Sequence, residues 1–235
     1  MFSLALKNIL FYKGRSITTV LLTFVSAMLF VVYVSMMDGS HKSMLENSLK
    51  IYTGAIEIYK KEYRELGGNE YLIKDVERIT KKLDSINGVK SYTTRYETYA
   101  LLSSKENSAA SMIAGIEPLK ESEHSSIKKA LVSGKYLSDL SGNCLYMGDG
   151  LVKKLKISLG SEVAFVGAAS DDSFAADIFK LCGVFKTGSF EFDTTSSFVS
   201  RDYFDALMYA KNKASYINIK VENLEDVDRI KKDIQ

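Results

Sequence analysis

The longest apolar stretch of the chain covers residues 17–37, close to the N-terminus. It contains no charged residue, no glycine and no proline. A helix of this length is roughly 30 Å long, which matches the hydrocarbon core of a bilayer. The basic residues Lys7, Lys13 and Arg15 precede the stretch. We therefore predict a transmembrane helix over residues 16–38, with the N-terminus in the cytoplasm and the later residues periplasmic or extracellular.

A cleaved signal peptide is the main alternative for this stretch. Such a peptide also has a basic start, but its apolar region runs only about 7–15 residues and ends at a small-x-small cleavage site. Here the apolar run is longer, and it ends in Ser-Met-Met-Asp at residues 35–38, without such a site. A span that is retained in the mature protein is therefore the preferred interpretation.

The residues on either side of the span also follow a helical spacing. Leu6, Ile9 and Leu10 fall on one face of a helix over residues 1–15. This predicts an amphipathic helix on the cytoplasmic surface of the membrane, although the same residues could simply flank the span. After the span, apolar positions keep a helical spacing while charges appear between them. Residues 39–53 are therefore predicted to continue the helix as a stalk.

Beyond residue 53, strand-like and helix-like patterns follow one another. Alternating polarity together with β-branched and aromatic residues predicts strands at residues 55–59, 89–102, 109–116, 144–147, 162–166, 178–185, 198–200 and 216–221. Apolar residues at every third or fourth position predict helices at residues 71–86, 127–131, 151–155 and 201–211, and after the capping Asn223. This mixture places the soluble part in the α+β class.

Two segments that lie far apart share a pattern of a strand followed by an amphipathic helix. Residues 56–60 precede a helical stripe that begins at Val76, and residues 217–220 precede one that begins at Val227. The first unit continues into a strand, whereas the chain ends inside the second helix. A strand–helix unit without its returning strand leaves a sheet edge uncovered. We therefore expect the chain to be a fragment, or its remainder to lie on another chain, unless the two stripes are similar by chance.

Composition and motifs indicate no enzymatic site. The formal charge is +2 with both signs interspersed, so no basic block suggests nucleic acid. The chain has no Walker phosphate loop, no nucleophile elbow and no H-E-x-x-H motif. We therefore assign no catalytic, cofactor-binding or metal-ligating residue. His41, His124 and the pair Asp171-Asp172 are expected to be solvated surface residues.

Cys144 and Cys182 are the only cysteines of the chain. They form neither a C-x-x-C motif nor a zinc pattern. Outside the membrane they either pair in a disulfide or are two small buried residues, and the sequence leaves both possibilities open.

The order of these elements, together with a series of short motifs, resembles a known family of membrane proteins. The motifs are GAIEIYK at residues 54–60, GIEP at 115–118, LVSGKYL at 131–137, GLVKKL at 150–155, LGSEV at 159–163 and GVFKTGSFEFD at 183–193. In this order they are similar to the permease subunits of MacB-like ABC transporters. That group includes the lipoprotein-releasing LolC/LolE proteins and the FtsX relatives.

The resemblance implies a MacB-like extracytoplasmic domain with two lobes. A porter lobe is built from two strand–helix halves, and a mostly β lobe, the sabre, is inserted between them. The internal repeat fits this plan. The porter halves are expected at residues 54–115 and 207–235, the second of them incomplete, and the sabre at residues 116–206. The family also has three further spans after this region, which supports the interpretation as a fragment.

The resemblance further implies a subunit without catalytic activity in the inner (plasma) membrane. Such a permease works with a separate cytoplasmic ATPase, with a second permease subunit in a homo- or heterodimer, and with a periplasmic acceptor or outer-membrane partner in some members. It transmits the motion of the ATPase to the outer lobes, for lipoprotein release or for export of a lipophilic or peptide substrate. The alternatives are a single-pass anchored sensor or binding domain, and an anchored enzyme.

The run Phe190-Glu-Phe-Asp193 alternates between aromatic and acidic residues. As an extended segment it would place Phe190 and Phe192 on one side and both acids on the other. The two aromatic side chains either fill the core of the sabre or line an interface with the stalk or with a second subunit.

Overall fold

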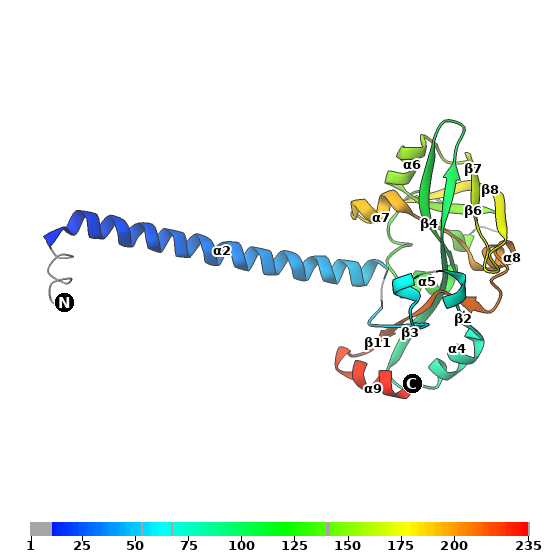
Figure 1. The fold of residues 1–235 in the computed structure, drawn as a ribbon, viewed down its shortest axis with the longest axis horizontal. Coiled ribbons are helices and arrows are strands. Elements are labelled where there is room, and N and C mark those ends of the chain that lie inside the picture. Colours follow the sequence, from blue (N-terminus) through cyan, green and yellow to red (C-terminus); the bar gives the residue numbers. More distant parts are fainter. Residues whose placement is uncertain (1–10, 53, 67, 140–141, 235) are drawn as a thin grey trace. The chain divides into compact units, whose positions relative to one another are not determined.

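The computed structural model describes residues 11–52, 54–66, 68–139 and 142–234 (Figure 1). The chain divides into two compact units, Met1–Ser48 and Leu49–Gln235. The predicted surface helix carrying Leu6, Ile9 and Leu10 lies outside the described residues, so it stays a prediction. The side chain of His41 lies outside them as well.

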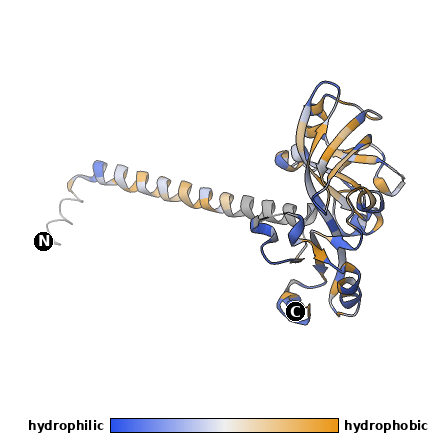
Figure 2. Ribbon diagram, turned by 45° about the vertical axis from the view of Figure 1, so that its right-hand side comes forward, coloured by the Kyte–Doolittle hydropathy of each residue, from blue (hydrophilic) through white to orange (hydrophobic). Residues whose placement is uncertain are grey.

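The described part of the first unit belongs to one long helix, α2 (Lys13–Ile51). Its section Lys13–Met37 is long and apolar enough to cross a membrane, and none of its most apolar part is buried in the structure. In Figure 2 hydrophilic residues at the start of α2 give way to pale and orange ones. The hydroxyls of Thr18, Thr19 and Thr23 each donate to the carbonyl four residues earlier at 2.8–2.9 Å, so these polar groups need no water. The predicted helix is confirmed as far as Ile51.

The second unit is organised around a mixed β-sheet, and Figure 1 shows its longest strands side by side. The described strands are β1 (Ile56–Tyr59), β3 (Val89–Ser103), β4 (Ser108–Ile116), β5 (Leu131–Gly134), β6 (Cys144–Gly148), β7 (Glu162–Ala168), β8 (Phe174–Phe185), β9 (Ser196–Ser200) and β11 (Tyr216–Val221). Their order is β1-β11-β3-β4-β9-β6-β8-β5. Because β7 pairs with both β3 and β8, the strands from β3 to β8 close into a ring.

Strand β3 links the two parts of this sheet. Its residues from Val89 to Arg95 pair with β11, whereas Tyr96 to Ser103 pair with β4. The last four residues of β3 pair with β7 as well. One strand therefore runs from the open part of the sheet into the closed ring.

The described residues form three apolar cores, which the faces of this sheet separate. The ring is filled by Tyr96, Leu102, Phe165, Phe179 and their neighbours. A second core lies against β1, β11 and the start of β3, and a third lies on the outer face of β4, β6 and β9. The remaining helices of the second unit are α3 (Tyr63–Leu66), α4 (Val76–Asp84), α5 (Pro118–His124), α6 (Asp149–Leu155), α7 (Phe190–Thr195), α8 (Arg201–Leu207) and α9 (Val227–Ile234), and all but α3 and α5 contribute side chains to these cores.

The internal repeat predicted from the sequence has a structural basis. Strands β1 and β11 pair with each other, antiparallel, with Ile56 opposite Ile219. The helices that follow them, α4 and α9, place Leu83 and Ile230 in the same second core, and both side chains are fully buried. The two strand–helix units therefore share one core.

Two predicted helices were wrong in extent or type. The helix predicted over residues 71–86 begins only at Val76, because Ile73 and Lys74 form the short strand β2, which pairs with β10 (Lys213–Ala214). The helix predicted over residues 127–131 is a turn followed by β5. Ile127 is fully buried in the third core and its carbonyl accepts the Tyr146 hydroxyl at 2.8 Å, so burial of a turn residue imitated a helical spacing.

Cys144 and Cys182 form a disulfide, with their Cα atoms 5.5 Å apart. Cys144 opens β6 and Cys182 lies in β8, two parallel neighbours that are joined by a long connection. The question that the sequence left open is therefore answered in favour of pairing. Disulfides persist in oxidising compartments and are rare in the cytosol.

We expect removal of this disulfide to destabilise the domain by about 4 kcal/mol, because the bond closes a loop between residues 38 positions apart. The double variant Cys144→Ala/Cys182→Ala of the full chain in detergent should unfold at a lower urea concentration, followed by tyrosine fluorescence. The parent chain treated with dithiothreitol is the matched control and should show the same loss. A double variant as stable as the oxidised parent would contradict the expectation.

Candidate functional site

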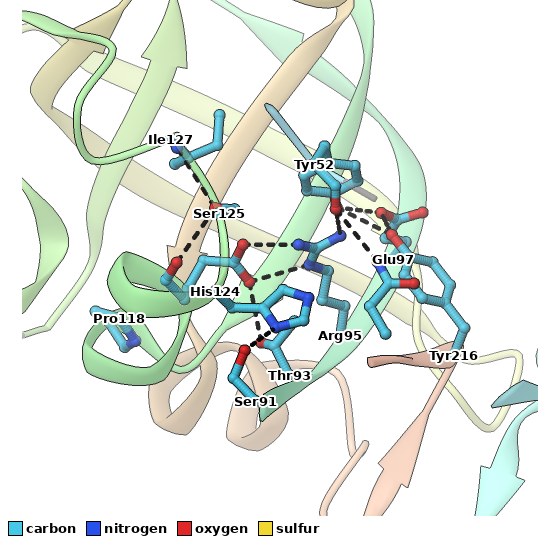
Figure 3. A network of polar contacts seen from close by, with 12 residues as sticks. Tyr52, Ser91, Thr93, Arg95, Glu97, Pro118, His124, Ser125, Ile127 and Tyr216 are labelled. Carbon is cyan, nitrogen blue, oxygen red and sulfur yellow. Dashed lines mark hydrogen bonds and ion pairs between the residues drawn. The ribbon is translucent and has the colours of Figure 1, made fainter. Parts of the chain in front are cut away.

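The last turn of α2 ends on a cluster of buried and half-buried polar side chains, which we call the Arg95 network (Figure 3). The network consists of Tyr52, Arg95, Glu97, Glu121 and Tyr216, with Thr93 and Asn218 at its margin. Thr93, Arg95 and Glu97 occupy alternate positions of β3, so they share one face of that strand. All of these residues belong to the compact unit that begins at Leu49.

At the centre of the network Arg95 forms a two-pronged ion pair with Glu121 of α5. The Nε and Nη2 groups of Arg95 donate to the two carboxylate oxygens at 3.0 and 2.7 Å, and both side chains are fully buried. The Thr93 hydroxyl donates to the same carboxylate at 3.0 Å. Burial alone would raise the pKa of Glu121, but the Arg95 charge and its hydrogen bonds outweigh burial and hold that pKa below its ordinary value.

Arg95 also caps the end of the helix. Its Nη1 group donates to the carbonyl oxygen of Tyr52 at 2.6 Å, and the Nδ2 group of Asn218 donates to the same oxygen at 3.3 Å. The carbonyls at a helix C-terminus lack partners within the helix and carry partial negative charge. A guanidinium at this position satisfies one of them and complements the helix dipole.

The ring of Tyr52 is held on several sides. The guanidinium carbon of Arg95 lies 3.6 Å from the ring centroid, and the rings of Phe192 and Phe198 lie 5.2 and 5.6 Å away. The Tyr52 hydroxyl donates to Glu97, which also accepts the hydroxyl of Tyr216. Backbone, ring and hydroxyl of this one residue therefore all contact β3, and the backbone also binds β11 while the ring also packs against α7 and β9.

Gly54 lets the chain turn from the helix into β1. A Cβ atom at this position would lie 2.5 Å from the carbonyl oxygen of Ile219, so no other residue fits without a shift of the backbone. The next residue, Ala55, donates its N–H to that carbonyl at 2.9 Å. The helix end is thus also tied to β11.

His124 is buried, so its predicted place on the solvated surface was wrong. It lies at the end of α5, a helix in a segment expected to be a polar connection, and its Nδ1 atom is 3.0 Å from the Ser91 hydroxyl. Burial lowers the pKa of His124 to about 4, although Glu121 opposes the shift. The helical spacing of Glu121 and His124 turns both toward β3, which the sequence pattern did not reveal.

The predicted extended run at residues 190–193 was wrong, because these residues form α7. Asp193 accepts hydrogen bonds from the Thr187 N–H at 2.9 Å and from the Gly188 N–H at 3.2 Å, which folds residues 187–189 into a turn at the start of the helix. As a result Phe190 and Phe192 point in different directions. Phe190 is 84% exposed, whereas Phe192 packs against Tyr52. An interface role for either residue remains a prediction.

Sequence reasoning missed the Arg95 network. A signal was present, because Thr93, Arg95 and Glu97 place polar groups at alternate positions of a predicted strand. The pattern alone fits a solvated strand face equally well. As for metals, none of the described His, Cys, Asp and Glu side chains gather in groups of three or more that could hold an ion.

Comparison with solved structures identifies the fold. The chain is similar to the extracellular domain of the noncanonic ABC-type transporter YknZ from Gram-positive bacteria, with a TM-score of 0.53 and 16% identity, over 74% of this chain and 86% of that one. It is also similar to the periplasmic region of MacB from Actinobacillus actinomycetemcomitans, with a TM-score of 0.52 and 13% identity, over 76% of this chain and 78% of that one.

Comparisons at the level of sequence give no match, either with models of protein families or with curated proteins. The structural likeness therefore rests on shape at low identity. It confirms the predicted fold class: a mixed α and β chain with an N-terminal apolar helix and a domain folded like the extracytoplasmic parts of MacB and YknZ.

We expect Arg95→Leu to lower the free energy of unfolding by about 3–5 kcal/mol, because it leaves Glu121 buried without its cation. The double variant Arg95→Leu/Glu121→Leu should lose less than the single one, since it removes both charges. Urea unfolding of the full chain in detergent measures the difference. Equal losses in the single and double variants would show that packing rather than charge holds this position.

Alanine substitution of Phe190 and of Phe192 should affect the free energy of unfolding differently. Phe192→Ala is expected to cost about 2–3 kcal/mol, because the ring is partly buried against Tyr52. Phe190→Ala should change the stability by less than about 0.5 kcal/mol, because its ring is exposed. A loss for Phe190→Ala equal to that for Phe192→Ala would contradict a solvent-exposed Phe190.

Proposed function

We propose that this chain is part of the permease subunit of an ABC-type transporter and carries motion from a cytoplasmic ATPase into an extracytoplasmic domain. The observation that carries the proposal is the fold of the second unit, since two solved counterparts are named as extracytoplasmic parts of such transporters. An apolar helix of membrane-spanning length precedes this domain directly. The chain itself is then a non-catalytic subunit.

The Arg95 network supports the transmitting role. Helix α2 runs from Lys13 to Ile51, and the residue after it, Tyr52, is bound to β3 and β11 by hydrogen bonds and a ring contact. Arg95 of β3 extends this connection to α5 through its ion pair with Glu121. A displacement of the helix end would therefore be passed on to the sheet, whereas a flexible loop at this position would absorb it. We also propose two lobes for the domain. Residues 54–115 and 207–235 form the porter lobe, and residues 116–206 form the sabre lobe.

The proposed orientation places the N-terminus in the cytoplasm and the domain outside. The basic residues before the apolar section favour this orientation, and the disulfide of the domain suits an oxidising compartment. The proposed partners are an ABC ATPase, a second permease subunit and the bilayer. The proposed transport classes are lipoprotein release and the export of a lipophilic or peptide substrate to an acceptor.

Two experiments test this proposal, beginning with the orientation. A membrane-impermeant maleimide applied to intact cells should label Lys60→Cys, an exposed position of the domain, and should leave Lys7→Cys unlabelled until the cells are opened. The native cysteines are paired and do not interfere. Labelling of Lys7→Cys alone in intact cells would reverse the orientation and contradict the proposal.

The second experiment tests coupling. The transporter purified through this chain from native membranes should contain an ABC ATPase and hydrolyse ATP. Hydrogen exchange of residues 49–59 should then differ between the nucleotide-free complex and the vanadate-trapped one, because ATP acts on the domain through α2. A complex without an ATPase, or with identical exchange in both states, would favour an anchored binding domain instead.

A further inference from the structure

A cavity of about 450 Å³ opens beside the Arg95 network, and its size is typical of ligand pockets. Half of its ten described lining residues are tyrosines: Tyr52, Tyr59, Tyr63, Tyr99 and Tyr216. Tyr52 directly follows α2, and the other four come from β1, α3, β3 and β11, so separate parts of the domain converge on one space. Tyr99 is 79% exposed and Tyr59 is 43% exposed, which leaves aromatic surface open to a ligand.

The charges around this cavity are unbalanced. Its described charged lining residues are Glu57, Glu65, Glu97 and Arg64, and Arg64 is already paired with Glu57. The nearest buried cation, Arg95, is committed to Glu121 and does not line the cavity. Within the described residues Glu97 accepts hydrogen bonds from two tyrosine hydroxyls and forms no ion pair. Burial raises the pKa of this carboxyl, and the hydrogen bonds and the more distant Arg95 only partly oppose that shift, so a cation in direct contact would stabilise the charged form.

Acceptors also outnumber donors at the floor of the cavity. Asn218 is only 1% exposed, and its Nδ2 group is used on the Tyr52 carbonyl. Its Oδ1 atom has no hydrogen-bond partner in the part of the chain that the structure describes. The hydroxyls of Tyr52 and Tyr216 already donate to Glu97. A ligand with several N–H donors and a positive charge would supply the hydrogen-bond donors and the cation that are missing at this floor.

Two tyrosines that line the cavity already contact a cation through the faces of their rings. The guanidinium carbon of Arg64 lies 5.4 Å from the ring centroid of Tyr59 while the group pairs with Glu57 at the rim. On the inner side the guanidinium of Arg95 lies over Tyr52. Aromatic faces with a carboxylate beside them attract ammonium and guanidinium groups. The cavity lined by Tyr59, Tyr63, Tyr99 and Glu97 offers the same combination of aromatic faces and a carboxylate.

We propose that this cavity binds a primary ammonium or guanidinium group, of the kind carried by a lysine or arginine side chain of a polypeptide. The cation pairs with Glu97, and the faces of Tyr59, Tyr63 and Tyr99 enclose its alkyl part. The proposal stands on the cavity alone and does not depend on the transport role. An ammonium could also come from a lipid headgroup, but such a headgroup adds a phosphate, which Glu65 and Glu97 repel.

The test uses the full chain in detergent micelles and saturation-transfer NMR, which detects weak ligands. N-acetyl-lysine methylamide is the probe, and N-acetyl-norleucine methylamide, which lacks only the amine, is the matched control. We expect the lysine compound to bind at least tenfold more tightly. Equal binding of both compounds overturns the proposal. Tighter binding of phosphoethanolamine than of the lysine compound overturns the polypeptide source.

Two variants locate the site. Glu97→Gln keeps an acceptor oxygen and removes the charge, so it should weaken the lysine probe at least tenfold. Tyr99→Ala removes an exposed wall and should weaken it several-fold with unchanged unfolding, which keeps the test valid even if Glu97→Gln folds poorly. Glu162→Gln, an exposed carboxylate of β7 outside the lining, is the control and should bind as the parent does. Unchanged binding in Tyr99→Ala, or a loss in Glu162→Gln equal to that in Glu97→Gln, overturns the proposal.

Discussion

The ion pair between Arg95 and Glu121 is the contact on which the arrangement of the domain depends. Moving two charges out of water costs several kcal/mol for each ion, and only good geometry with further hydrogen bonds offsets that cost. Here Arg95 donates two hydrogen bonds to Glu121, and Thr93 donates a third to the same carboxylate. The Nη1 group of Arg95 donates to the Tyr52 carbonyl oxygen. Strand β3, helix α5 and the end of α2 are therefore fixed relative to one another by a single guanidinium.

This kind of junction differs from an apolar contact in its response to force. The attraction between apolar surfaces has no preferred direction and depends mainly on the area removed from water. A buried charge that moves away from its partner loses hydrogen bonds and remains without water. The surroundings of Tyr52, with a cation on one side and the rings of Phe192 and Phe198 on others, limit rotation as well. The junction therefore resists displacement until it breaks.

The sequence predicted the framework well and the junction poorly. Periodicity located the apolar helix, the long strand β3 and the repeated strand–helix units, because each depends on local spacing of apolar residues. Arg95, Glu121 and His124 meet only through tertiary packing, and a polar residue in sequence is by default expected at the surface. The turn that Asp193 organises similarly overrode the alternation of residues 190–193.

The position of β11 has a consequence for the order in which the domain assembles. Among the described strands β1 comes first in the chain and β11 last, yet the two pair with each other, and β3 also needs β11 along its first half. Pairing of this kind cannot proceed from one end as the chain is synthesised. Strand β1 and the first half of β3 therefore lack this partner until the chain has been synthesised as far as Val221. The residues that follow α2 therefore gain their contacts with Asn218 and Ile219 only after most of the chain has been made.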